Sequence, residues 1–291
     1  MKERIFDAEF LKKLESLVIN SIITMSEGSG GNRKSRSKGS SVEFSDFREY
    51  SSGDDFRRID WNAFGRFDRL FVKLFMEERE ALVNVFIDCS KSMSCGTPSK
   101  SVYSLKLAGV LAFLALSNMD RVSINALYQN NLKQSSIVTG KNMFDRCISF
   151  LEELEFTGET AVCGAVKRKD IKNKGISFII SDFFSADGIE AAVRYLLYKN
   201  QDVVLIHVLS PEELKPAMDG QVRLLDSETR DTVDIAVTPV LMKQYEKALS
   251  SFISNIKELS SRMGAAYVLL STADSIEKAV LEDFVRTGII R

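Results

Sequence analysis

Histidine, tryptophan and proline are scarce in this 291-residue sequence, which contains one His, one Trp and four Pro. The single histidine, His207, and four cysteines without a C-x-x-C pair argue against a zinc site. A Ser-His-Asp arrangement would also have to use His207, but no G-x-S-x-G motif accompanies it, so the sequence favours a satisfied histidine at the end of a buried strand. We expect free thiols at the four cysteines, which are Cys89, Cys95, Cys147 and Cys163.

An excess of charge of either sign is also missing, since 39 Lys and Arg face 40 Asp and Glu. This balance gives no global argument for binding to nucleic acid or to an anionic membrane. No apolar run approaches the roughly 20 residues of a membrane-spanning helix, and residues 1–14 lack a secretory hydrophobic region, so we expect a cytoplasmic protein without a membrane span. A Gly/Ser-rich stretch at 27–41 holds four bases, Arg33, Lys34, Arg36 and Lys38, and is interpreted as a solvated loop.

The most informative stretch is the apolar run 82–87 followed by Asp88-Cys89-Ser90-Lys91-Ser92. Its length and its β-branched and aromatic content predict a strand that is buried on both faces and ends at Asp88. Ligands of open parallel sheets bind beyond the carboxyl ends of the strands. Three oxygens on alternate positions of such a turn, from Asp88, Ser90 and Ser92, can converge on one small hard cation. The alternative is a purely structural role, in which a serine-rich turn uses its acid to cap the next helix.

Strands and helices alternate along the rest of the chain, and this predicts an α/β fold with a mostly parallel central sheet and helices on both faces. Ahead of the sheet we expect an amphipathic helix at 6–25 and an arm with short strands at 42–47 and 70–75. The predicted strands after 88 are 121–128, 132–138, 175–180, 202–209, 221–225, 232–236 and 266–270, and the predicted helices are 102–119, 142–154, a short one from 161, 188–198, 239–263 and 275–286.

Two further oxygen-bearing residues fall where a cation at Asp88 would need them. Asp182 ends a buried strand as Asp88 does, and Thr160 lies in a glycine-containing loop just before a helix. The set therefore comprises Asp88, Ser90, Ser92, Thr160 and Asp182. An all-oxygen set with two carboxylates suits Mg²⁺, or Mn²⁺ or Ca²⁺, and disfavours zinc and copper.

These residues resemble the metal-ion-dependent adhesion site (MIDAS) of von Willebrand factor A-like domains. A second block resembles the signature of the bacterial "domain of unknown function 58" family, DUF58. Its matching residues are Glu43-Phe44, Arg48-x-Tyr50, Gly53-Asp54-Asp55-x-Arg57-x-Ile59-Asp60-Trp61, Arg66, Val72-Lys73, His207-Val208-Leu209 and Leu225-Asp226-x-Glu228-Thr229. Relatives often show G-x-T-D-L in the loop that here reads Gly158-Glu159-Thr160-Ala161-Val162, so the threonine is retained and the acid is not.

The resemblance implies a metal-dependent protein-interaction module without catalytic activity. It also implies a partnership with a MoxR-type AAA+ ATPase, because family members are often encoded beside one, and a chaperone-like role. A partner or client would supply a Glu or Asp to the metal. We expect three parts: residues 1–41 with the helix and basic loop, the family-signature arm 42–80, and the von Willebrand factor A-like domain 81–291.

An enzyme is the rival interpretation. The acids Asp54, Asp55 and Asp60, or the pair Asp88 and Asp182, could serve a metal-dependent hydrolase. Nearby arginines (Arg48, Arg57, Arg58 and Arg66) instead favour a structural network of ion pairs that pins the arm to the main domain, with Trp61 and neighbouring phenylalanines as apolar anchors.

Overall fold

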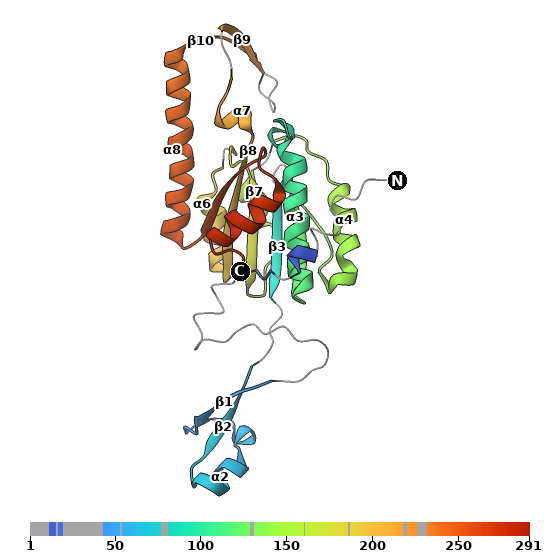
Figure 1. Ribbon diagram of the computed structural model, residues 1–291, viewed down its shortest axis with the longest axis vertical. Coiled ribbons are helices and arrows are strands. Elements are labelled where there is room, and N and C mark those ends of the chain that lie inside the picture. Colours follow the sequence, from blue (N-terminus) through green and yellow to red (C-terminus); the bar gives the residue numbers. More distant parts are fainter. Residues whose placement is uncertain are drawn as a thin grey trace. The chain divides into compact units, whose positions relative to one another are not determined.

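The computed structural model describes the chain in two compact units (Figure 1). The larger is formed by residues up to 30 and from 81 onward, and the smaller by residues 31–80. The described residues are 12–15, 17–19, 43–52, 54–76, 81–128, 131–159, 161–185, 187–217, 220–225 and 232–291. The three-part division expected from the sequence stays a prediction, and the basic residues 33–38 lie outside the described ranges.

The larger unit is built on one sheet with the strand order β11-β8-β7-β3-β4-β5, in which β6 also pairs with β4. Neighbours from β11 to β4 run parallel, whereas β5 and β6 are antiparallel to β4. From β3 the chain moves to β4 on one side and later returns to β7 on the other, so a topological switch lies between β3 and β7. The strands are β3 Leu82–Asp88, β4 Arg121–Tyr128, β5 Asn131–Gln134, β6 Val138–Thr139, β7 Gly175–Ser181, β8 Gln201–Leu209 and β11 Ala266–Ser271.

Helices cover both faces of this sheet, which confirms the predicted fold class (Figure 1). β3 illustrates why: all seven of its residues are buried, with Val85 in the hydrophobic cluster on one face and Phe86 in the cluster on the other. The face beneath Val85 is covered by α3 Lys100–Ser117, α4 Phe144–Glu152 and the C-terminal segment α9 Ile276–Lys278 with the π-helix η5 Ala279–Phe284. The face beneath Phe86 is covered by α5 Val162–Lys167, α6 Glu190–Tyr198 and α8 Pro239–Met263.

Helix α3 is apolar almost all round because it lies within the core. It is long and apolar enough to cross a membrane, but 72% of it is buried inside the larger unit, as is typical of a core helix. The strands predicted at 221–225 and 232–236 are present as β9 Gly220–Leu225 and β10 Thr232–Val237, which pair antiparallel as a hairpin. It leads into α8, where the Thr238 hydroxyl accepts from Leu241 N at 3.2 Å and Pro239 occupies the first turn.

The predicted helix 6–25 is wrong at its described C-terminal part. Residues 12–14 do form a helical turn, but 17–19 are not helical. Val18 and Arg291 exchange two backbone hydrogen bonds of 2.9 and 3.0 Å, and Ile19 bridges to Ile290. Pairing with the C-terminus buries Ile19 to 1% exposure, and this long-range contact overrides the helical periodicity.

The smaller unit contains the two strands predicted for the arm, β1 Glu43–Glu49 and β2 Phe71–Met76, paired antiparallel. Between them lie the 3₁₀ turn η2 Phe56–Arg58 and helix α2 Trp61–Phe67. The prediction that Trp61 and neighbouring phenylalanines anchor the arm to the main domain stays a prediction, because the two units are described separately. Trp61 is 64% exposed and Phe67 is 66% exposed, although their rings contact Phe64 and Phe71 edge-on.

Candidate metal centre at the carboxyl edge of the sheet

Asp88 and Asp182 lie together at the switch point of the sheet. Ile87 of β3 is in register with Ile180 of β7, so the acids that follow emerge on the same edge. Each is only 1% exposed. Burial, and then the charge of Asp182, raise the pKa of Asp88 above its ordinary value. Two close buried carboxylates are a costly arrangement unless a cation accompanies them.

Asp88 is held at both of its oxygens. Oδ1 accepts from Ser90 N at 3.0 Å, which is the bond that shapes the turn, and Oδ2 accepts from Ser181 Oγ at 2.6 Å. Ser181 Oγ in turn accepts from Phe183 N at 2.8 Å. The last residue of β7 thus orients Asp88, a role for Ser181 that sequence reasoning missed even though the residue stands directly before Asp182.

The two serines of the turn converge, as the D-x-S-x-S spacing predicts. Ser90 Oγ and Ser92 Oγ are 2.9 Å apart, with Ser90 buried and Ser92 half-buried. Lys91 N donates to Gly158 O at 2.9 Å and Thr157 N donates to Cys89 O at 2.9 Å, so the loop before Thr160 is pinned to this turn. Thr160 itself lies outside the described residues.

Lys100 is the main feature of the site that the sequence did not reveal. Its side chain is fully buried, and Nζ donates to Asp182 Oδ2 at 2.8 Å and to Glu213 Oε1 at 2.5 Å. The same ammonium stands 5.6 Å from the centre of the Phe184 ring. Although burial opposes it, the charges of Asp182 and Glu213 leave the pKa of Lys100 raised.

Two close contacts hold together the segment that precedes Lys100 and the segment that carries Glu213. Gly96, at φ +92°, lies so near Ser210 that a Cβ added to it would stand 2.4 Å from the Ser210 Cβ. Ser210 begins helix α7 Pro211–Leu214 with a capping box, in which Glu213 Oε2 accepts from Ser210 N at 2.8 Å. The Ser-Pro-Glu-Glu sequence after β8 carries that capping signal and could have located Glu213.

The residues at this edge fit a divalent cation. When ionised, Asp88, Asp182 and Glu213 face one ammonium, that of Lys100, which leaves two negative charges unbalanced. Within the described ranges no three His, Cys, Asp or Glu side chains gather as a metal cluster, so a cation here would depend on the serine hydroxyls. Hydroxyl and carboxylate oxygens are the donors that Mg²⁺, Mn²⁺ and Ca²⁺ accept.

The rival acid cluster in the smaller unit is not assembled as a site. Asp54 pairs with Arg48 at 2.6 Å and accepts from Ser51 N, and Asp55 accepts from Arg57 N at 3.0 Å. Asp60 caps α2 through Asn62 N and Ala63 N. Its second oxygen meets Lys73 Nζ at 3.1 Å. Each acid has a structural partner, although of the predicted arginines only Arg48 forms an ion pair with one of them in the described part of the arm.

His207 is buried near the end of β8, as predicted, but the prediction that its polar atoms are satisfied holds for Nδ1 and not for Nε2, which has no hydrogen-bond partner among the described residues. Its Nδ1 is 2.8 Å from Tyr267 Oη, and its ring makes edge contacts with Phe183 and Phe252. Burial lowers its pKa to about 4, so the ring is neutral at physiological pH.

Comparison with protein families matches residues 46–251 to the family described as "Protein of unknown function DUF58". Three uncharacterized proteins, one of Mycobacterium bovis and two of Mycobacterium tuberculosis strains, are each 25% identical over 246 residues, covering 82% of this chain and 76% of the relative.

Three solved structures are similar to this chain at low sequence identity. The conserved hypothetical protein BatB from Bacteroides thetaiotaomicron is 15% identical with a TM-score of 0.45, covering 72% of this chain and 98% of that one. An aerotolerance-related membrane protein from Bacteroides fragilis is 16% identical with a TM-score of 0.44, covering 71% and 99%. The SpRpn10 VWA domain is 9% identical with a TM-score of 0.39, covering 70% and 95%.

Proposed function

This chain belongs to the family of proteins of unknown function DUF58, and we propose that it is a non-enzymatic protein-interaction module whose carboxyl-edge site holds a divalent cation, Mg²⁺ in the first place. The observation that carries the proposal is the convergence of Asp88, Ser90 and Ser92 beside Asp182. Asp88, Ser90 and Ser92 would hold the cation, with Thr160 and Asp182 completing the shell. A bound Mg²⁺ supplies an electrophilic coordination position that a Glu or Asp of another protein can fill.

The surrounding residues keep this oxygen set in place. Ser181 holds one Asp88 oxygen, and the turn's own backbone holds the other. Lys100 pairs with both Asp182 and Glu213, which holds the Asp182 carboxylate in position and offsets part of its negative charge. Because Asp182 then neutralises less of the charge of a bound cation, that cation stays more electrophilic toward a carboxylate of another protein.

The partner we propose is a MoxR-type AAA+ ATPase, with a client protein still to be identified. The support for this partner is the family resemblance of residues 43–73 and of the D-x-S-x-S turn. The proposal that the chain is not an enzyme is supported by the structural engagement of Asp54, Asp55 and Asp60 in hydrogen bonds and ion pairs.

Calorimetric titration of the metal-free protein with Mg²⁺ tests the site directly. Asp88→Asn keeps the shape of the side chain, whereas Asp88→Ala would also leave the Ser181 hydroxyl and Ser90 N without an acceptor. We expect Asp88→Asn and Ser92→Ala each to weaken Mg²⁺ binding by about tenfold or more, since a hydrogen bond or ligand contact to a charge carries that scale of energy. Ser94→Ala, in the same turn but exposed, is the matched control and should bind as wild type.

Binding to a partner is tested by a pull-down with the purified MoxR-type ATPase, with and without EDTA. We expect capture in Mg²⁺, loss in EDTA and loss with Asp88→Asn. Capture that is indifferent to EDTA would refute metal-dependent binding, and Mg²⁺-dependent phosphoesterase activity lost in Asp88→Asn would favour the hydrolase.

A further inference from the structure

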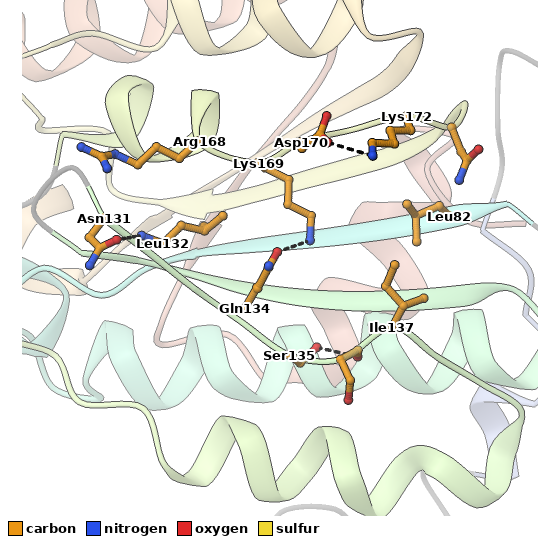
Figure 2. A pocket seen from close by; sticks show the side chains of 12 residues that line it. Leu82, Asn131, Leu132, Gln134, Ser135, Ile137, Arg168, Lys169, Asp170 and Lys172 are labelled. Atoms are coloured by element: carbon orange, nitrogen blue, oxygen red, sulfur yellow. Dashed lines mark hydrogen bonds and ion pairs between the residues drawn. The ribbon is translucent and has the colours of Figure 1, made fainter.

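A pocket of about 810 Å³ lies beside the edge of the sheet, on a different part of the larger unit from the candidate metal centre. One wall is formed by residues 131–137, and the other by residues 168–173, between α5 and β7 (Figure 2). Leu82 lies at the pocket and Asp88 at the opposite end of β3, about 20 Å away at the rise of a strand. The two places share no residue.

Lys169 sets the chemistry of this pocket. Its residue is only 6% exposed, and Nζ donates to Ser123 Oγ and to Gln134 Oε1, both at 2.9 Å. Figure 2 shows the side chain reaching across the pocket to Gln134. Both partners are neutral, and no ion pair is formed with any carboxylate of the described residues. Buried ammonium groups are normally paired with an acid, so this one lacks its counter-charge.

The charge around Lys169 is positive as well. Arg168 extends toward the end of the pocket where Asn131 lies (Figure 2) and, within the described ranges, forms no ion pair. The one acid of the lining, Asp170, pairs with Lys172 at 3.3 Å. The two cations Arg168 and Lys169 therefore have no paired carboxylate among the described residues. Burial lowers the pKa of Lys169 to about 8, which leaves the group protonated at neutral pH.

We propose that this pocket binds a small molecule carrying a phosphate monoester, with the phosphate at Lys169 and with Arg168 attracting the ligand from the Asn131 end of the pocket. A phosphate monoester brings a charge of about −1.5 to −2 at neutral pH, which supplies the counter-charge that the buried ammonium lacks and leaves further negative charge to interact with Arg168, whereas a single carboxylate supplies only one charge. The ammonium has three N–H groups, of which two are engaged in the structure, so one is free for a phosphate oxygen.

The rest of the ligand follows from the remaining space and its lining. The pocket is far larger than a phosphate group, and its volume is within the range of about 300–1,000 Å³ typical of small-molecule sites. Asn131, Ser136 and Asn173 offer amide and hydroxyl groups to the body of the ligand. These groups suit a polyhydroxylated body, such as that of a sugar phosphate or a nucleotide, rather than an apolar one.

Calorimetric titration of the full chain, at low salt and in EDTA, separates this inference from the proposed metal function. The probes are ribose 5-phosphate, AMP and inorganic phosphate, with adenosine as the uncharged control. We expect the phosphate-bearing probes to bind and adenosine not to bind. Lys169→Gln, which keeps a hydrogen-bond donor without the charge, should weaken ribose 5-phosphate binding by about tenfold or more.

Lys172→Gln is the matched control, because that lysine lies in the same wall but is already paired, and it should bind within about threefold of wild type. The exposed Arg168→Gln tests the second cation if Lys169→Gln does not fold, and it too should weaken binding. Absence of binding by every phosphate-bearing probe, or equal binding by wild type, Lys169→Gln and Arg168→Gln, would overturn the inference whether or not Mg²⁺ binds at Asp88.

Discussion

At the scale of single residues, Lys100 is bound to its surroundings by charge rather than by packing alone. Replacing it with Met removes the ammonium but retains most of the volume, so that Asp182 and Glu213 face each other without a counter-charge. Breaking a buried ion pair from one side costs about 3–5 kcal/mol, and we expect that loss of unfolding free energy in urea. Lys278→Met, which removes an exposed ion pair with Asp274, is the control and should leave the midpoint of urea unfolding unchanged.

Lys100→Met should strengthen metal binding, although it lowers the stability of the fold. Without Lys100 the edge carries one more unbalanced negative charge, so Mg²⁺ should bind Lys100→Met more tightly than it binds wild type. Mg²⁺ should accordingly raise the melting temperature of the variant by more than that of wild type. Equal Mg²⁺ affinities in calorimetry would show that Lys100 does not act on the site.

Lys169 gives a pH dependence whose sign follows from its lowered pKa. The unfolded group titrates near 10.5 and the folded group near 8, so between these values the unfolded chain binds more protons and stability rises with pH. Relative to Lys169→Gln, wild type should gain up to about 3 kcal/mol between pH 8 and pH 10.5. Chemical denaturation of both proteins at the two pH values measures the difference, which also cancels the titration of other groups. A difference that stays constant with pH contradicts the prediction.

How far individual residues could be anticipated depends on whether their role is local. Asp88, Ser90 and Ser92 were predictable because their spacing within one turn makes them converge. Lys100 was not, because a lysine in the first turn of a helix has the same local sequence whether it reaches solvent or a buried acid. Its partner Glu213 is 113 positions away, and only the folded sheet brings the two together.

At the scale of elements, the strands of the sheet were the most predictable because burial on both faces leaves continuous apolar runs. The N-terminal segment shows the limit of that approach. Its periodicity indicates a helix, but residues 17–19 pair with the last two residues of the chain, a partner that periodicity does not detect. Helix α9 likewise passes into a π-helix, η5, where a regular α-helix was expected.

Gly175 tests how tightly the elements at the switch point are joined. It begins β7, and a Cβ added to it would lie 2.1 Å from Leu82 O, a backbone atom that cannot move without displacing β3. Overpacking costs typically about 1–3 kcal/mol and occasionally more, and we expect the upper end of this range for Gly175→Ala. Urea unfolding followed by circular dichroism measures the loss.

Gly188→Ala separates a steric clash from backbone strain. Gly188 has φ +64°, but nothing lies within 4 Å of an added Cβ, so its substitution should cost only the left-handed penalty of about 1–2 kcal/mol. If Gly175→Ala lowers the free energy of unfolding by less than Gly188→Ala does, then β3 and β7 can move apart at Leu82 and Gly175 more easily than their close contact indicates.

At the scale of the whole molecule, the two compact units differ greatly in how much they bury. Both hydrophobic clusters of the larger unit are built from residues outside 31–80, and so are the candidate metal ligands. In the smaller unit, Val72 and Asp60 are the buried residues among those whose side chains are described. A pair of strands on its own is marginally stable in water. The sequence predicted both the arm and the sheet domain, because polar and apolar residues alternate in β1 and β2. How much surface each part buries depends on long-range contacts, which this alternation does not specify.

We therefore expect the larger unit to fold without the arm. Replacing residues 43–76 with Gly/Ser repeats of equal length should leave cooperative thermal unfolding, with Mg²⁺ affinity within about threefold of the intact chain, because the two described hydrophobic clusters and the candidate ligands all lie outside this segment. The excised peptide 43–76 should show little strand signal in circular dichroism, because a two-stranded sheet on its own does not offset the conformational entropy lost on folding. A replaced chain that melts without cooperativity would mean that the arm is part of the folding unit, and that its exposed aromatic side chains, Trp61 and Phe67 among them, are covered in solution.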